Sequence, residues 1–204
     1  YKILVTGGAG YIGSILVKDL LDNNNKITVL DNLLFQQNSL LDCCNYENFE
    51  FIKGDICDYD LIKKILPKFD IIIPLAAIVG APACKKNPTL TKLVNDESYI
   101  FLIENLSIDQ KVLFPTTNSG YGIGSKSEFC TEETPMNPIS EYGITKVKIE
   151  KAFLDRGNSI TFRLATVFGM SPRMRMDLLV NDFVYRAVND KTIVLFEEND
   201  DLVI

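Results

Sequence analysis

Histidine is absent from all 204 residues of the chain. This absence excludes Ser-His-Asp triads, Cys-His pairs and histidine metal sites built from this chain alone. The five cysteines show no CxxC spacing, so we expect no metal site and reduced thiols, as in a cytoplasmic protein. They are Cys43, Cys44, Cys57, Cys84 and Cys130.

Runs of basic residues and long apolar runs are also missing. The net charge is −6, which disfavours a nucleic-acid partner. The longest apolar run, Ile71 to Cys84, is interrupted by Pro74, Gly80 and Pro82, and it is shorter than the roughly 20 residues that cross a membrane. We therefore expect no membrane span, and the first residues show no secretory signal.

The most informative stretch is KILVTGGAGYIG, residues 2–13, followed by an apolar-periodic run from Ile15 to Leu21. It predicts a strand, a glycine turn and a helix, with GxGxxG at the junction. We assign the tight turn to Gly8, close backbone approach to a pyrophosphate to Gly10, and helix packing to Gly13. This arrangement predicts dinucleotide binding at the helix N-terminus, whereas an isolated motif could be an ordinary turn.

Two acids follow the next strands. Lys26 to Leu30 predicts a second strand ending at Asp31, the position expected for a carboxylate that accepts both ribose hydroxyls and repels a 2′-phosphate. Asp31 therefore predicts NAD in preference to NADP. A third strand, Phe49 to Lys53, leads to Asp55, which either binds adenine beside Ile56 or caps a helix.

Further strands are predicted at 70–73 and 111–114, with helices at 61–66 and about 89–107 between them. The alternation of strands and helices predicts a Rossmann-type, doubly wound parallel α/β sheet. Small residues at Pro74 to Ala77 would let a cofactor lie against the backbone, or merely end a strand. Residues 116–138 predict a long functional loop.

A helix beginning near Ser140 places Tyr142 and Lys146 one turn apart on one face. A YxxxK pair is common by chance. Here, an ammonium and a positively charged nicotinamide near the phenol would favour the phenolate and make Tyr142 a general base. Lys146 could also bind the nicotinamide ribose, and Thr117 could hydrogen-bond the substrate hydroxyl.

Together TGGAGYIG, Asp31, TTNSGYG, YGITK and FRLATVFG resemble the extended short-chain dehydrogenase/reductase family of nucleotide-sugar epimerases, dehydratases and dehydrogenases. The resemblance covers essentially the whole chain. It implies an NAD-dependent enzyme whose catalytic residues are Thr117, Tyr142 and Lys146.

The resemblance also implies binding residues. Those expected at the cofactor are Gly7, Gly10, Tyr11, Ile12, Gly13, Asp31, Asn32, Asp55, Ile56, Leu75, Ala76, Ala77, Asn95, Tyr142 and Lys146. Those expected at a nucleotide-sugar substrate are Thr117, Asn118, Thr166, Arg173 and Asn181. Arg173 and Arg175 suit a diphosphate, unless SPRMR is a solvated basic turn.

Three stretches look closer still to a bacterial branch that modifies GDP-manno-heptose for capsule or surface polysaccharide: IIPLAAIVGAPACKKNP, TTNSGYGIG and RLATVFGMSPRMRMDLLVNDFVYRA. Sugar 4,6-dehydratases of the family place Asp and Glu after the catalytic Thr, where this chain has Asn118 and Ser119. An amide does not titrate and a hydroxyl is a weak base, so elimination of water is disfavoured.

We expect an NAD-binding domain over residues 1–165 and the start of a smaller, incomplete substrate lobe over 166–204, including a strand from Thr192 to Phe196. The resemblance also implies a homodimer that pairs the helix near 92–107 with the YxxxK helix. The residues expected to meet there are Tyr99, Ile100, Leu102, Ile103, Leu106, Ile149, Ala152 and Phe153.

The sequence thus predicts oxidation at C4 of a GDP-manno-heptose-like nucleotide sugar. A 4-epimerase is the alternative outcome of the same chemistry. A non-catalytic nucleotide-binding module is the alternative of another class.

Overall fold

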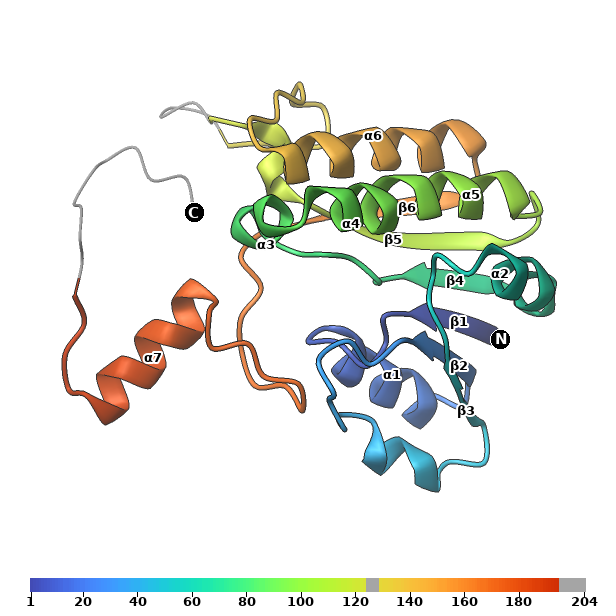
Figure 1. Cartoon of the computed structure of the whole chain (residues 1–204), viewed down its shortest axis with the longest axis horizontal. Helices are drawn as coiled ribbons and strands as arrows, with labels where there is room; N and C mark the ends of the chain where they lie inside the picture. The colour runs from blue at the N-terminus through green and yellow to red at the C-terminus, as the bar shows by residue number, and fades with distance from the viewer. Residues whose placement is uncertain (124–128, 195–204) are drawn as a thin grey trace.

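The computed structural model describes residues 1–123 and 129–194, which form a six-stranded parallel sheet flanked by helices (Figure 1). The strand order is β3-β2-β1-β4-β5-β6. The strands are β1 (Lys2–Thr6), β2 (Lys26–Asp31), β3 (Phe49–Lys53), β4 (Ile71–Pro74), β5 (Lys111–Thr117) and β6 (Ser159–Leu164). The winding direction reverses between β1 and β4, and such a switch point opens a crevice at the carboxyl ends of the strands.

Helical segments connect the strands. The α-helices are α1 (Gly13–Asp22), α2 (Tyr59–Ile65), α3 (Ala81–Lys86), α4 (Pro88–Lys92), α5 (Ser98–Asn105), α6 (Glu141–Arg156) and α7 (Leu179–Asn189). Short 3₁₀ segments are η1 (Leu41–Asn45), η2 (Leu66–Lys68) and η4 (Asn118–Tyr121), and η3 (Leu93–Glu97) is a π-helical turn. The predicted doubly wound parallel fold is confirmed.

Two apolar layers hold the sheet. Helices α2, α5 and α6 pack on one face through residues such as Ile62, Leu102 and Phe153. The other face packs against α1 and η1 through Val17 and Cys43. Strands β1, β2 and β4 end at neighbouring registers, because Thr6 of β1 is opposite both Leu30 and Pro74. The residues that follow these three strands therefore meet at one edge.

Several elements differ from the sequence prediction. The single helix expected over about 89–107 is α4, η3 and α5 in succession, and β5 extends to Thr117 instead of Phe114. Helix α3 was not predicted, although Gly80 at φ +92° and Pro82 in its first turn begin it. Strand β6 and α7 were not predicted either.

The end of the chain leaves the sheet after β6. Residues 165–178 run past the glycine turn at the start of α1, and α7 lies apart from the sheet (Figure 1). The strand predicted from Thr192 to Phe196 is not formed at 192–194, where no backbone partner strand is present, and its last two residues lie outside the described residues.

Four of the apolar residues expected at a dimer interface belong instead to the core of the chain. Tyr99, Leu102, Ile149 and Phe153 are buried in the core of this chain. The expectation that these four side chains meet a partner is therefore wrong. They are buried because α5 and α6 pack on the sheet. These helices carry more apolar residues than one sheet-facing stripe needs, because each contacts both the sheet and the neighbouring helix.

Across residues 1–123 and 129–194, no helix is long and apolar enough to cross a membrane. In the same residues, no group of three or more Cys, Asp or Glu side chains is arranged to hold a metal ion. All five cysteines are free thiols.

Candidate active site

A cavity of about 620 Å³ lies where the carboxyl ends of the central strands meet. It is lined by the glycine turn, the ends of β2 and β4, and the first turns of α6. The predicted cofactor residues that line it are Gly7, Gly10, Tyr11, Ile12, Gly13, Asp31, Asn32, Asp55, Ile56, Leu75, Ala76, Ala77, Tyr142 and Lys146. Asn95 is the one predicted cofactor residue that does not.

The glycine turn is shaped by Gly7. Its φ is +70°, and a Cβ there would lie 2.5 Å from the backbone nitrogen of Ala76. The prediction of the tight turn at Gly8 is therefore wrong: Gly8 instead packs against Val29, which a Cβ would approach to 2.8 Å. At Gly13 a Cβ would lie 2.6 Å from the Cα of Gly8, which confirms the close packing predicted for that glycine.

Asp31 joins the end of β2 to the glycine turn. Its Oδ2 accepts from the backbone N–H of Ala9 at 3.0 Å, and its Oδ1 accepts from that of Leu33 at 2.8 Å. Burial raises the pKa of this carboxyl, while the two backbone donors oppose the shift. The carboxylate is thus fixed at the cavity wall, where the spacing of the sequence predicts it.

Asn32 and Asp55 form a polar pair at the same wall. The amide Nδ2 of Asn32 donates to Asp55 Oδ2 at 2.8 Å, and Asp55 Oδ1 accepts from the backbone N–H of Cys57 at 2.9 Å. The helix cap of α2 is Asp58, which accepts from the N–H of Leu61. Of the two roles open for Asp55, capping is therefore taken by another residue.

Asn95 acts behind the cavity wall. Its Oδ1 accepts from the N–H of Ile78 and its Nδ2 donates to the C=O of Ile78, both at 2.8 Å. Asn95 is buried within the π-helical turn. It therefore fixes the loop of Leu75 to Val79, which lines the cavity, whereas Asn95 itself is not part of the lining.

Tyr142 and Lys146 lie in the first half of α6. The Oγ of Ser140 caps this helix by accepting from the N–H of Gly143 at 3.0 Å. Lys146 is 7% exposed, and its ammonium has one long contact, 3.5 Å to the C=O of Pro115. The same Nζ lies 4.6 Å from the centroid of the Phe114 ring.

Burial dominates the titration of both residues. It raises the pKa of Tyr142 to about 12, a shift that Cys84 reinforces and Arg175 opposes. It lowers the pKa of Lys146 to about 8. The sequence predicts that an ammonium and a nicotinamide together favour the phenolate. In the chain itself, desolvation of Tyr142 outweighs the attraction of Arg175 and favours the neutral phenol.

The two threonines at the end of β5 face different surroundings. Thr116 is buried, lines the cavity, and its Oγ1 has no hydrogen-bond partner. The Oγ1 of Thr117 donates to Ser119 Oγ at 3.1 Å and accepts from the Ser119 N–H, and Thr117 is not part of the lining. Successive strand residues point to opposite faces, which separates the two hydroxyls.

The predicted substrate residues are dispersed. Arg173 lines the cavity, with its guanidinium 4.4 Å from the centroid of the Phe35 ring. Asn118 lines a separate hollow with Tyr121 and Arg163, and Thr166 lines neither space. Asn181 is buried and bonds to Gly169, Arg175 and Tyr11.

Arg175 is a further cation of the cavity wall. It pairs with Asp177, with Nε 3.1 Å from Oδ1, and this pairing lowers the pKa of Asp177. Arg173 and Arg175 both line the cavity, a position that favours the predicted role at a diphosphate over a solvated turn.

A family model described as the NAD dependent epimerase/dehydratase family matches residues 3–202. The chain belongs to this family. Members of this family depend on NAD, and the predicted membership in the NAD-dependent epimerase and dehydratase family, of the extended short-chain dehydrogenase/reductase type, is confirmed.

Individual relatives are mostly nucleotide-sugar epimerases. The chain is 35% identical over 177 residues to the UDP-glucose 4-epimerase of Lactobacillus helveticus, covering 83% of this chain and 52% of that enzyme. UDP-glucuronic acid 4-epimerase of Bacillus cereus, solved with UDP-glucuronic acid and NAD, superposes with TM-score 0.82 at 28% identity, covering 97% of this chain and 66% of that one.

A third relative is matched over the same share of both chains. UDP-N-acetylglucosamine 4-epimerase of Methanobrevibacter ruminantium superposes with TM-score 0.83 at 28% identity, covering 97% of this chain and 66% of that chain. The chain thus spans about half to two thirds of the length of these epimerases.

The cavity of this epimerase/dehydratase family member fits a dinucleotide. A Cβ at Gly10 would meet only the C=O of Gly7, so that side of the backbone is open to a pyrophosphate. The buried ammonium of Lys146 has a single long contact, and the buried hydroxyl of Thr116 has none. Both groups need partners, and ribose hydroxyls or an amide can supply them.

The sequence prediction omitted Thr116 and Phe35 from this family site. Thr116 could have been found from the strand alternation, because it shares a face with buried Val112 and Phe114. Phe35 lies in a stretch without periodicity, and its position opposite Arg173 depends on a tertiary contact that carries no sequence signal.

Proposed function

We propose that this chain is the cofactor-binding part of a nucleotide-sugar 4-epimerase. The observation that carries the proposal is that Tyr142 and Lys146 line one cavity with the glycine turn and Asp31. A base for a sugar hydroxyl and a binding site for a dinucleotide thus share one space. The epimerase relatives support the C4 position.

Each residue has a proposed task. The glycine turn and Asp31 would hold NAD, which would supply the hydride acceptor for C4 of the sugar. Tyr142 takes the proton of the C4 hydroxyl, and Lys146 holds the nicotinamide ribose and stabilises the phenolate with its charge. Thr117 is assigned to the same sugar oxygen on resemblance, because it is bonded to Ser119 and is not part of the cavity lining, while Thr116 contacts the cofactor side.

The substrate is a sugar joined to a nucleoside diphosphate. Arg173 and Arg175 offer two cations for the diphosphate. Thr166 and Asn118 are further predicted contacts, and neither lies in the cavity lining, so these two assignments rest on resemblance.

A 4-dehydrogenase acting on a GDP-manno-heptose-like sugar for surface polysaccharide is the second candidate. It is favoured by the resemblance of the three stretches around residues 72–88, 116–124 and 163–187. Asn118 and Ser119 disfavour dehydration in either case. The epimerase relatives support the first candidate more strongly.

A non-catalytic nucleotide-binding module is the rival of another class. It would not require a tyrosine and a lysine one turn apart at the cavity, so Tyr142 and Lys146 favour catalysis. Free thiols at all five cysteines support a reducing, cytoplasmic location.

Domain limits and assembly belong to the same proposal. The NAD-binding domain comprises residues 1–165, because β6 ends at Leu164, and residues 166–204 begin the substrate lobe. We further propose a homodimer through the outer surfaces of α5 and α6. Ile100, Ile103 and Leu106 are only partly buried there and remain available, and a monomeric mass at micromolar concentration would contradict this pairing.

The test is turnover by the full-length protein on UDP-, dTDP- and GDP-linked sugars, including GDP-manno-heptose. Products are identified by NMR and mass spectrometry, and NADH by absorbance. A C4 epimer without free ketone supports the epimerase. Accumulated 4-keto sugar with NADH would establish the dehydrogenase, and no turnover on any substrate would favour the binding module.

A further inference from the structure

Asn181 is the one buried residue of helix α7, whose second half is exposed. It lies in the first turn of α7 and is 6% exposed, whereas Val184, Tyr185 and Val188 on the same helix are all more than half exposed. A buried amide must have its hydrogen bonds satisfied. The partners that satisfy Asn181 show which parts of the chain it holds together.

Those partners belong to two distant segments. The Oδ1 of Asn181 accepts from the N–H of Gly169 at 2.9 Å, and its Nδ2 donates to the C=O of Arg175 at 2.9 Å. The same Nδ2 donates to the hydroxyl of Tyr11 at 3.1 Å, and that hydroxyl donates to the C=O of Gly169 at 2.6 Å.

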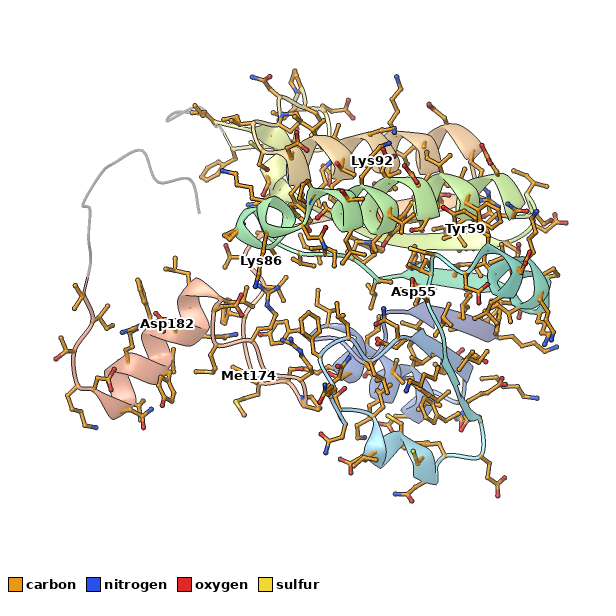
Figure 2. All side chains as sticks on the ribbon, viewed as in Figure 1. Asp55, Tyr59, Lys86, Lys92, Met174 and Asp182 are labelled. Atoms are coloured by element: carbon orange, nitrogen blue, oxygen red, sulfur yellow. The ribbon has the colours of Figure 1, made fainter. Side chains whose placement is uncertain are left out.

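Residues 169–177, here called the strap, are thereby fastened beside the glycine turn. Ser171 adds a second attachment, since its Oγ donates to the C=O of Tyr11 at 2.8 Å. Arg173 adds a third by stacking on Phe35. In Figure 2, Met174 of the strap lies between Asp182 of α7 and helix α1.

The strap contributes residues to the cavity lining next to Tyr11, to which it is hydrogen-bonded. Arg173, Arg175 and Asp177 line the cavity together with Tyr11 and Phe35. A ligand seated against the glycine turn would therefore be bordered by residues that these attachments hold in place. Two attachments are independent of Asn181 and Tyr11: the Arg173 stack and a contact of 3.0 Å between the hydroxyls of Ser171 and Ser14 on α1. The other attachments described above involve Asn181, Tyr11 or both.

We infer that Asn181 is a positioning residue that fastens the strap to Tyr11 at the edge of the cofactor cavity and so slows the release of the dinucleotide. Asn181 is not part of the cavity lining and acts through Tyr11, Gly169 and Arg175. The inference rests on the proposed function for its ligand. It deepens that function, because an epimerase must retain NADH until the ketone is reduced again.

The experiment follows release of NADH from the full-length protein, using nicotinamide fluorescence after a chase with excess NAD. Asn181→Ala should release NADH at least tenfold faster than wild type. Tyr11→Phe, which removes only the hydroxyl, should give a similar increase. The double variant should be little faster than the single ones, because both changes open one attachment.

The matched control is Asn189→Ala on the same helix. Asn189 is exposed, and its amide donates only to the C=O of Tyr185 one turn earlier, so release should stay within twofold of wild type. Each variant is measured 15 °C below its own melting temperature. A role confined to stability would lower that temperature and leave the release rate unchanged.

The outcomes separate this inference from the proposed function. Unchanged release in Asn181→Ala, or faster release in Tyr11→Phe alone, overturns the inference whatever the enzyme turns over. Should Asn181→Ala fail to fold, unchanged release in Tyr11→Phe overturns it equally. Faster release in both variants supports it even if no sugar is converted. In an active enzyme, Asn181→Ala should also shift product from epimer towards free 4-keto sugar and NADH.

Discussion

The carboxylate of Asp31 accepts a hydrogen bond from the backbone N–H of Ala9 at 3.0 Å, joining the end of β2 to the glycine turn. This contact holds a negative charge beside the expected position of the adenosine ribose. Asp31→Ser should weaken NAD binding by roughly tenfold, since a charge-assisted hydrogen bond is worth about 1.5–3 kcal/mol. It should also reduce the preference for NAD over NADP. Calorimetric titration of both cofactors measures the change.

The control for Asp31 is Asp19→Ser on the exposed surface of α1. It changes the same charge without touching the cavity, so both affinities should stay unchanged. Tighter binding of NADP than NAD by the wild-type protein would contradict the role given to Asp31.

Gly7 is expected to be the least replaceable glycine of the turn. Gly7→Ala should lower the free energy of unfolding by more than about 2 kcal/mol, because it combines an unfavourable positive φ with overpacking. Gly157 also has positive φ, +82°, but a Cβ there would meet only Ile108 Cδ1 at 4.0 Å. In urea unfolding, the free energy of unfolding should therefore fall by at least about 1 kcal/mol less in Gly157→Ala than in Gly7→Ala. Equal losses of this free energy in the two variants would show that the contact with Ala76 is unimportant.

Local signals predicted much of the fold and the cofactor wall. The glycine turn, Asp31 and the Tyr142–Lys146 pair are each defined by residues close in sequence, so spacing alone places them. The buried strands are likewise short apolar runs. The conformation of Gly7 was missed because two adjacent glycines offer the same freedom, and only the approach of Ala76 decides between them.

Long-range contacts account for what the sequence could not predict. Asn181 and Tyr11 are separated by 170 positions, and nothing near either residue indicates the other. The π-helical turn that aims Asn95 at Ile78 rather than at the cavity depends on one extra residue per turn, which an apolar period does not reveal.

The two threonines of β5 should have separable roles. Thr117→Val should lower kcat at least tenfold with little change in the KM for sugar, because its hydroxyl serves the reacting oxygen. Thr116→Val should mainly raise the Kd for NAD, since its unpartnered hydroxyl faces the cavity wall. Steady-state kinetics and titration distinguish them. The reverse pattern would assign catalysis to Thr116.

Tyr142→Phe should keep the affinity for NAD while losing most turnover, because it removes the proton acceptor and little volume. Tyr185→Phe on exposed α7 is the matched control and should leave turnover unchanged. Since burial raises the pKa of Tyr142 to about 12, NAD with its positive nicotinamide should lower it. Ultraviolet titration of tyrosinate, compared between wild type and Tyr142→Phe with and without NAD, measures that shift. An active phenylalanine variant would remove Tyr142 from its proposed role.

Lys146 should destabilise the fold at neutral pH. Its pKa falls from 10.5 in the unfolded chain to about 8 in the folded chain. At pH 7 the side chain is therefore charged in both states, and folding buries a charged ammonium. The shift corresponds to roughly 3 kcal/mol. Lys146→Met should therefore increase the free energy of unfolding at pH 7 by up to about 3 kcal/mol, although turnover is lost.

The pH dependence gives the sharper test. Above pH 8 the folded protein releases the proton of Lys146 before the unfolded chain does, so wild-type stability rises relative to Lys146→Met until about pH 10.5. The advantage of the methionine variant should shrink over this window and vanish at its upper end. Lys148→Met, on the same helix with a half-exposed ammonium paired to Asp96, should show no such convergence. A gain from Lys146→Met that stays constant between pH 7 and pH 10.5 would mean that the buried lysine is not charged at pH 7, or that its burial carries no electrostatic penalty.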